Sequence, residues 1–189
     1  MDVMSPQTRN VLFTYEDYLL FPEDGRRHEL MGGEHYVTPA PTTKHQQASG
    51  NLFGLIHAHL RHTKTGRLFS APTDVVLSDL DVVQPDLLLV SASRVAIITE
   101  KHIHGAPDLV IEILSETTRK TDEIVKRKLY ERYGVAEYWI VDPELETVKV
   151  YRLTDQGYMR AAELAKEAGD ILATPLLPGF QLSLAEIFD

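Results

Sequence analysis

Two acidic residues within apolar segments are the sequence feature that most strongly suggests chemistry. Glu112 interrupts the apolar run over residues 109–114, and Asp86 follows a proline within the apolar segment 82–90. An isolated buried carboxylate costs free energy, so each acid needs a compensating partner. A structural ion pair is the simpler interpretation of one buried Glu, but two such segments in one chain favour a shared site. Carboxylate oxygens are the ligands that Mg²⁺ prefers, so Asp86 and Glu112 are candidate metal ligands.

The segments that carry these acids are predicted to be buried strands. A strand covered on both faces has near-continuous apolar residues, as both segments do. Successive side chains of a strand alternate between its faces, so Asp108 points the same way as Glu112 and is a further candidate for a small carboxylate site. Pro85 has no backbone donor and suits a strand start or a bulge, which would redirect the side chain of Asp86.

The order of the predicted elements favours an α/β domain with a mixed sheet. Paired glycines at 32 and 33 predict an amino-terminal hairpin, and composition alone favours solvated positions for its acids, Glu29 and Glu34. The expected elements that follow are a helix over 44–61, strands over 67–77, 82–90 and 109–114, a short helix within 91–101, a helix to residue 133, a strand over 137–142, and further strands over 147–153 and 158–164.

The expected helix over residues 44–61 begins next to His45 and contains two glycines. Each of Gly50 and Gly54 should weaken the helix by about 1 kcal/mol relative to alanine. A close approach of the helix to the sheet would offset that cost.

Asp122, Lys126 and Tyr130 form an i, i+4, i+8 row on the helix that follows the Glu112 strand. If this row faces water, Lys126 pairs with Asp122 and contributes roughly 0.3–0.5 kcal/mol. If it faces the sheet, the Lys126 ammonium approaches the carboxylates. The second orientation predicts that Lys126→Ala removes an activity of the site while the melting temperature changes little.

The composition is that of a single acidic domain. With 189 residues and 43% apolar content, the chain is long enough for one full core, and no second domain is expected. The net charge of −9 argues against broad attraction to nucleic acid, so any DNA contact has to be local. The lack of cysteine, of a signal peptide and of an apolar segment of about 18 residues predicts a cytoplasmic protein without membrane contact. Residues 1–10 are expected to form a loose start.

Motifs along nearly the whole chain resemble the Uma-two endonuclease family, within the PD-(D/E)xK restriction-endonuclease-like superfamily. Each motif is weak alone, but the combination is specific. The resemblance implies a restriction-endonuclease-like mixed β-sheet flanked by helices, with added amino- and carboxy-terminal β-hairpins and a core order of helix, three strands, helix and strand. The matching segments are Gly33-Glu34, His45, Val83-Gln-Pro-Asp86, residues 107–115 (PDLVIEILS), Asp122 with Lys126 and Tyr130, residues 134–143 (GVAEYWIVDP), and Leu177-Pro-Gly-Phe180.

The resemblance implies metal-assisted hydrolysis of DNA phosphodiester bonds. Asp86 would take the role of the PD aspartate and Glu112 that of the (D/E)xK acid, together holding Mg²⁺ or Mn²⁺. The lysine expected two residues after the acid is absent, because residue 114 is leucine. In related families this lysine lies on the following helix, which makes Lys126 its substitute, with Lys120 as the second choice. Further ligands or supporting residues would come from Asp108, Glu34, His45, Gln84 and Tyr130.

A second class of function is a catalytically silent nucleic-acid- or protein-binding module on the same fold. The acidic net charge and the missing local lysine favour this alternative, whereas carboxylates in buried strands favour the enzyme. A homodimer is also expected, because several apolar residues lie near apparent sheet edges, and exposed edges invite pairing. These residues are Val148, Val150, Leu177 and Phe180.

Overall fold

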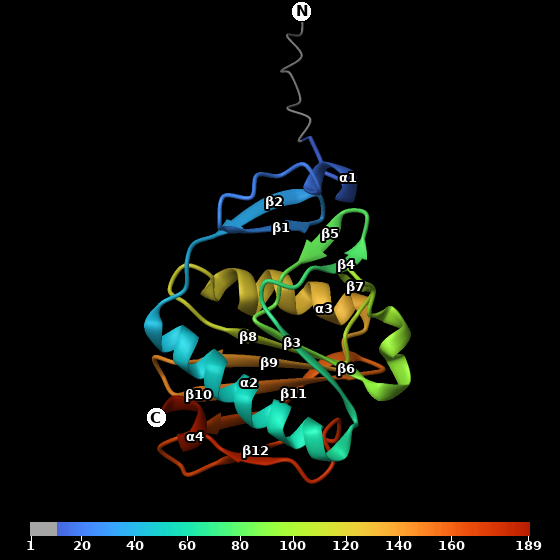
Figure 1. The fold of residues 1–189 in the computed structure, drawn as a ribbon. Coiled ribbons are helices and arrows are strands. Elements are labelled where there is room, and N and C mark those ends of the chain that lie inside the picture. Colours follow the sequence, from blue (N-terminus) through green and yellow to red (C-terminus); the bar gives the residue numbers. More distant parts are fainter. Residues whose placement is uncertain (1–10) are drawn as a thin grey trace, which may run out of the picture.

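The computed structural model describes residues 11–189, and the expected loose start over residues 1–10 lies outside them. The described chain forms two larger sheets, one small sheet and the helices that cover them (Figure 1). In chain order the elements are α1 (Tyr15–Tyr18), β1 (Arg27–Met31), β2 (Glu34–Thr38), α2 (Thr43–Thr63), β3 (Gly66–Ser70), β4 (Val75–Ser78), β5 (Asp81–Val83), β6 (Leu87–Ser91), the 3₁₀-helix η1 (Ala92–Ile97), β7 (Ile103–His104), β8 (Leu109–Ile113), the π-helix η2 (Thr121–Lys126), α3 (Arg127–Tyr133), β9 (Glu137–Asp142), β10 (Thr147–Thr154), β11 (Gly157–Ala165), β12 (Ile171–Ala173), β13 (Gln181–Ser183) and α4 (Ala185–Phe188).

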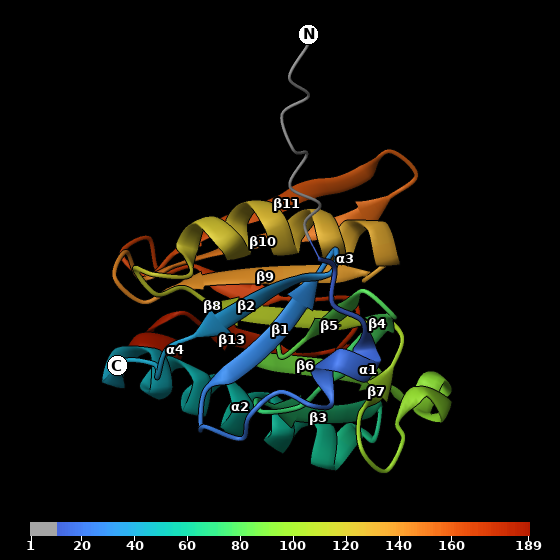
Figure 2. The ribbon, with the colours of Figure 1, turned by 90° about the horizontal axis from the view of Figure 1, so that it is seen from above.

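The central sheet has the strand order β11-β10-β9-β8-β6-β3. Strands β8 and β9 are parallel and the other neighbours are antiparallel, so the sheet is mixed, as predicted. Side chains alternate between two apolar layers: Leu87 and Ile111 pack in the layer with α2, whereas Leu88 and Val110 pack in the layer with α3. Figure 2 shows α2 and α3 on opposite faces of this sheet. The predicted core order of helix, three strands, helix and strand is therefore confirmed in α2, β3, β6, β8, α3 and β9.

A five-stranded sheet with the order β2-β1-β5-β4-β7 lies beside the central one. Strands β5 and β6 belong to different sheets, so the single strand expected over residues 82–90 is wrong. Residues 84–86 cross from one sheet to the other, and Pro85 suits this break because it has no backbone donor. The strand expected over 67–77 is likewise divided, into β3 and β4. The crossing places Asp86 between the two sheets.

Helix α2 begins one residue before the predicted start and covers the central sheet with an apolar stripe. The hydroxyl of Thr42 caps it by accepting from the main-chain N–H of His45 at 3.3 Å. Its buried residues include Ala48, Leu52 and Ile56, four residues apart. No helix within residues 11–189 is both long enough and apolar enough to cross a membrane.

The carboxy-terminal strands complete the core on the α2 side of the central sheet. The four apolar residues behind the expected homodimer are all buried in this layer, together with residues of α2 and β8. They are Val148, Val150, Leu177 and Phe180. Because the chain's own core covers them, they offer no surface for a second copy, and that basis for a homodimer is wrong.

Candidate active site

The pairing of β6 with β8 brings Asp86 and Glu112 together. Leu87 pairs with Ile111 in antiparallel register, so one further step along both strands places Asp86 opposite Glu112. Both side chains are buried, and the main-chain N–H of Asp86 donates to Oε2 of Glu112 at 3.4 Å. Like charges opposite each other destabilise a sheet unless other groups compensate. The surrounding side chains must therefore compensate the charges of Asp86 and Glu112.

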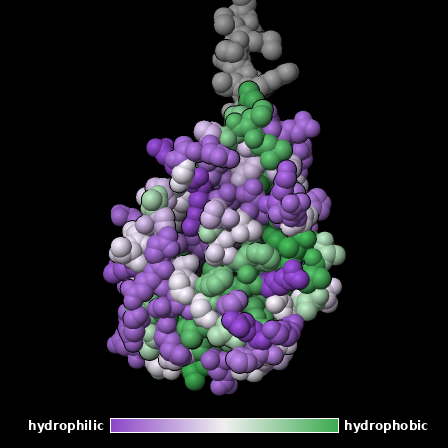
Figure 3. All heavy atoms as spheres, in the orientation of Figure 1, coloured by the Kyte–Doolittle hydropathy of each residue, from purple (hydrophilic) through white to green (hydrophobic). Residues whose placement is uncertain are grey.

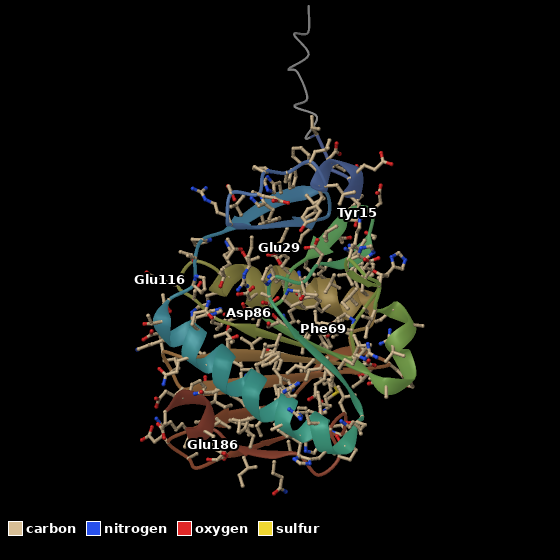
Figure 4. All side chains as sticks on the ribbon, in the orientation of Figure 1. Tyr15, Glu29, Phe69, Asp86, Glu116 and Glu186 are labelled. Carbon is tan, nitrogen blue, oxygen red and sulfur yellow. The ribbon has the colours of Figure 1, made fainter. Side chains whose placement is uncertain are left out.

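A cavity of about 300 Å³ opens beside the two acids, between the β1–β2 hairpin, the start of α2 and η2. In Figure 4, Glu29 lies on the smaller of the two large sheets, above Asp86. The acidic and basic residues that line the cavity are Arg27, Glu29, His45, Asp86, Glu112, Glu116, Asp122 and Lys126. Such a concentration of ionisable groups in one concave site is typical of a functional site.

Lys126 faces the sheet and not the solvent. Its Nζ lies 3.0 Å from Oε1 of Glu112 and 2.9 Å from Oε1 of Glu29. Asp122 is its third carboxylate neighbour, at 3.6 Å. The hydroxyl of Tyr130 donates to the same Glu112 oxygen at 2.8 Å. Lys126 is the last residue of a π-helix, a form that often occurs at functional sites. Of the two orientations left open by the sequence, the structure has the one in which the row faces the carboxylates.

Asp86 is held by donors on several sides. Its Oδ1 accepts from Arg27 Nη1 at 2.5 Å, and its Oδ2 binds His45 Nε2 at 3.0 Å. The main-chain N–H of Ile113 donates to Oδ2 at 2.8 Å. Burial raises the pKa of Asp86, but the hydrogen bond and charge of His45, together with Arg27, outweigh burial and hold the pKa at about 2. Asp86 is therefore ionised at neutral pH.

Glu112 has the opposite protonation behaviour. Burial raises its pKa to about 8, because the attraction of Lys126 does not compensate for burial and for the neighbouring carboxylates of Asp122 and Asp86. Burial also raises the pKa of Asp122, to about 6. Burial lowers the pKa of Lys126, but Glu112, Glu29 and Asp122 outweigh it and raise that pKa well above its ordinary value. One ammonium is thus shared by several carboxylates, and Glu112 retains a proton at neutral pH when no other cation is present.

The metal-free protein is expected to lose stability as the pH rises from about 5 to 8. A carboxyl group whose pKa is higher in the folded than in the unfolded chain binds its proton more tightly when folded. For Glu112, the resulting stabilisation is complete below the unfolded pKa of about 4.3 and is lost as the pH rises through about 8. One proton corresponds to at most about 1.4 kcal/mol per pH unit. Urea unfolding in EDTA across this range measures the slope.

Glu112→Gln is the control for this pH dependence, because it removes the titrating group and keeps the shape of the side chain. The variant should have a shallower slope than the parent between pH 5 and 8. Equal slopes in the two proteins would mean that Glu112 does not carry the proton.

The donor set of the cavity fits a divalent cation. The buried acids are Glu29, Asp86, Glu112 and Asp122, and the permanent cations beside them are Arg27 and Lys126. Four carboxylates against two cations leave two negative charges in excess when all are ionised. Within residues 11–189, no group of three or more His, Asp or Glu side chains is arranged to hold a metal. A bound ion would therefore rely on two carboxylates, with water and phosphate as further ligands, as Mg²⁺ often does.

His45 contacts an acid of the cavity directly, and Gln84 contacts another acid from outside the cavity. His45 lines it and binds Asp86. The main-chain N–H of Gln84 donates to Oε1 of Glu29 at 2.8 Å, and its side-chain amide donates to Asp74 at 2.7 Å. Gln84 therefore positions Glu29 from behind and does not line the cavity.

Three other sequence candidates lie away from the cavity. Asp108 shares the face of Glu112, but four strand residues, about 13 Å, separate them. It accepts hydrogen bonds from the Ser91 N–H and the Arg94 guanidinium. Glu34 and Lys120 are exposed, and neither lines the cavity. A shared strand face is thus not enough to place two side chains in one site.

Strand β1 contributes two residues, Arg27 and Glu29, that the sequence analysis missed. The solvated position expected for Glu29 is wrong, since only 2% of this residue is exposed. The expectation failed because a hairpin strand considered alone has one face open to water, whereas β1 lies between β2 and β5. The adjacent apolar residues Leu30 and Met31 were the sequence signal for a strand covered on both faces.

The fold and the site together define a restriction-endonuclease-like α/β protein. The mixed sheet lies between two helices, and its two acids lie on neighbouring strands near a lysine from the following helix. The chain belongs to the Uma2 family, described as "Putative restriction endonuclease", whose model matches residues 15–185. A search of curated proteins found no match.

A solved structure shares this fold. It is the crystal structure of a protein described as a putative nuclease belonging to DUF820 from Anabaena variabilis. The TM-score is 0.78 at 23% sequence identity, and the alignment covers 93% of this chain and 97% of that chain. At this identity the likeness shows a common fold, and the activity has to be argued from the site.

Proposed function

We propose that this protein is a metal-dependent endonuclease that hydrolyses DNA phosphodiester bonds. The observation that carries the proposal is the contact of Lys126 Nζ with Glu112 at 3.0 Å, beside Asp86. We infer that Lys126, on the next helix, takes the role of the lysine missing from position 114. This placement supports Lys126 over Lys120, which is exposed.

Asp86 and Glu112 would hold the Mg²⁺ or Mn²⁺ ion. When bound, such an ion polarises the phosphate and lowers the pKa of a coordinated water. Oε2 of Glu112 is available for this role, because its sole hydrogen bond to residues 11–189 is the 3.4 Å contact with the Asp86 N–H. Arg27 occupies Oδ1 of Asp86, and its side chain is 23% exposed, so an incoming phosphate would reach its guanidinium from the cavity.

The remaining residues of the cavity would position and balance these groups. Lys126 is placed to stabilise negative charge that develops on the phosphate. Tyr130 and Lys126 both bind Oε1 of Glu112, which leaves Oε2 for the metal ion. Glu29 holds Lys126 from the opposite side. His45 keeps Asp86 ionised through its hydrogen bond.

A catalytically silent module on the same fold is the alternative, and the buried charges argue against it. Four buried acids around one cavity, with two permanent cations beside them, are costly to maintain in a scaffold that uses none of them. The proposal concerns the single chain. The homodimer stays an expectation from the sequence, without support from the side chains that suggested it.

The purified protein is expected to nick or linearise plasmid DNA in Mg²⁺ or Mn²⁺ and to be inactive in EDTA. Gel electrophoresis over time measures this activity, with single-stranded DNA and RNA tested in parallel. Cleavage of RNA alone would contradict the DNA substrate. No cleavage of any nucleic acid in either metal would favour the silent module.

A further inference from the structure

A second cavity lies on the other side of Arg27 and Asp86. It has a volume of about 260 Å³, and these two residues are part of its lining as well as that of the first cavity. The other lining residues come from one side of α2 and from the end of β3 and the loop after it. They are Gln46, Ser49, Gly50 and Phe53, with Ser70 and Ala71. A chain that passes Arg27 and Asp86 would therefore run from one cavity into the other.

The lining of the second cavity differs chemically from that of the first. Apart from Arg27 and Asp86 at the shared boundary, none of its lining residues in the described part of the chain is charged; the lining offers the amide of Gln46, two serine hydroxyls and the ring of Phe53. In Figure 3, hydrophobic and hydrophilic side chains lie close together on the face that carries α2. Neutral polar groups beside an aromatic ring suit a nucleobase and its sugar, because bases stack on aromatic side chains. The phosphate next to that sugar would meet Arg27.

Gly50 lines this cavity and gains nothing from packing against the sheet. A Cβ atom built at Gly50 meets nothing within 4 Å, so no close helix-to-sheet contact offsets the cost of glycine there. Glycine in a helix weakens it, and the residue is exposed. A longer side chain at this position would extend into the cavity or over its mouth. Gly54 also meets nothing within 4 Å, but it does not line the cavity.

Resting on the nuclease function proposed above, we propose that the second cavity binds the unpaired nucleoside adjacent to the phosphate at Arg27, so that single-stranded DNA is preferred over duplex DNA as the substrate. The volume supports one nucleoside: it lies just below the range of about 300–1,000 Å³ that small-molecule sites occupy. A stacked base pair would need more room than this. The flanking base must therefore be unpaired to enter.

Gly50→Met and Gly54→Met test this proposal as a matched pair on one helix. Both changes replace an exposed glycine by a better helix former, so both variants should melt at or above the parent temperature. Gly50→Met should weaken binding of a fluorescently labelled single-stranded oligonucleotide in EDTA by roughly 5–150-fold, the range expected for loss of one stacked base. Gly54→Met should bind like the parent. Fluorescence anisotropy measures the affinities.

Cleavage of matched single-stranded and duplex DNA in Mn²⁺ separates this proposal from the nuclease function itself. If the parent cleaves DNA but Gly50→Met binds and cleaves as Gly54→Met does, the nucleoside cavity is overturned and the nuclease stands. Faster cleavage of duplex than of single strands by the parent would overturn the unpaired substrate. A parent that neither binds nor cleaves any DNA would overturn both.

Discussion

Replacing Glu112 by glutamine is expected to lower the rate of DNA cleavage by at least about 10²–10³-fold without lowering the melting temperature. Glutamine keeps an oxygen that can accept from Lys126 and from the Tyr130 hydroxyl, which both bind Oε1 in the parent. It removes a carboxylate that is buried among other carboxylates and has a pKa raised to about 8 by burial. The fold therefore loses no favourable charge at neutral pH, while the site loses one of the two acids proposed to hold the metal ion.

Calorimetric titration with Mn²⁺, alongside the cleavage assay, tests the role of Glu112 directly. Binding should be lost or strongly weakened in Glu112→Gln. Asp108→Asn is a matched control, because it removes another buried acid next to the same strand but outside the cavity. The control should retain Mn²⁺ binding and activity. If Glu112→Gln binds Mn²⁺ like the parent, the proposed metal site is wrong.

Replacing Lys126 by methionine is expected to have two large effects. The free energy of unfolding should fall by about 3–5 kcal/mol, the usual cost of breaking a buried ion pair from one side. The cleavage rate should fall by about 10²–10³-fold, as for other groups that stabilise transition-state charge. Lys126 is only 5% exposed and contacts three carboxylates. This expected loss is larger than the small change predicted from the sequence, because the sequence did not show that Lys126 is buried among three carboxylates.

A double variant separates the structural role of Lys126 from its proposed role in the reaction. In Lys126→Met with Glu29→Gln, one of the carboxylates left without a cation is removed. Urea unfolding should show that part of the lost stability returns, a coupling that a double-mutant cycle quantifies. Cleavage should stay as slow as in the single variant. Recovery of activity together with stability would mean that Lys126 acts only as a structural counter-charge.

The sequence alone determined which segments form the core and that two acids would be buried in it. Apolar periodicity is a local property, so it located α2, β8 and β9 and identified Asp86 and Glu112 as acids that need partners. The helix predicted to end at residue 133 does end there, and Gly134 caps it in the left-handed conformation with a φ of +79°. Propensity and periodicity act within a few residues of each position, which is why these expectations hold.

Only the tertiary structure decided which polar groups meet. The register of β6 on β8 sets Asp86 against Glu112, while the distance along one strand keeps Asp108 out of the cavity. The break at Pro85 moves the chain between two sheets, and the second sheet supplies Arg27 and Glu29, which no local pattern connects to the acids. The orientation of Lys126 likewise depends on the face that the helix buries. These contacts join residues that are far apart in the chain, so strand pairing and helix packing determine them. A buried charge meets its partner only where two elements come together.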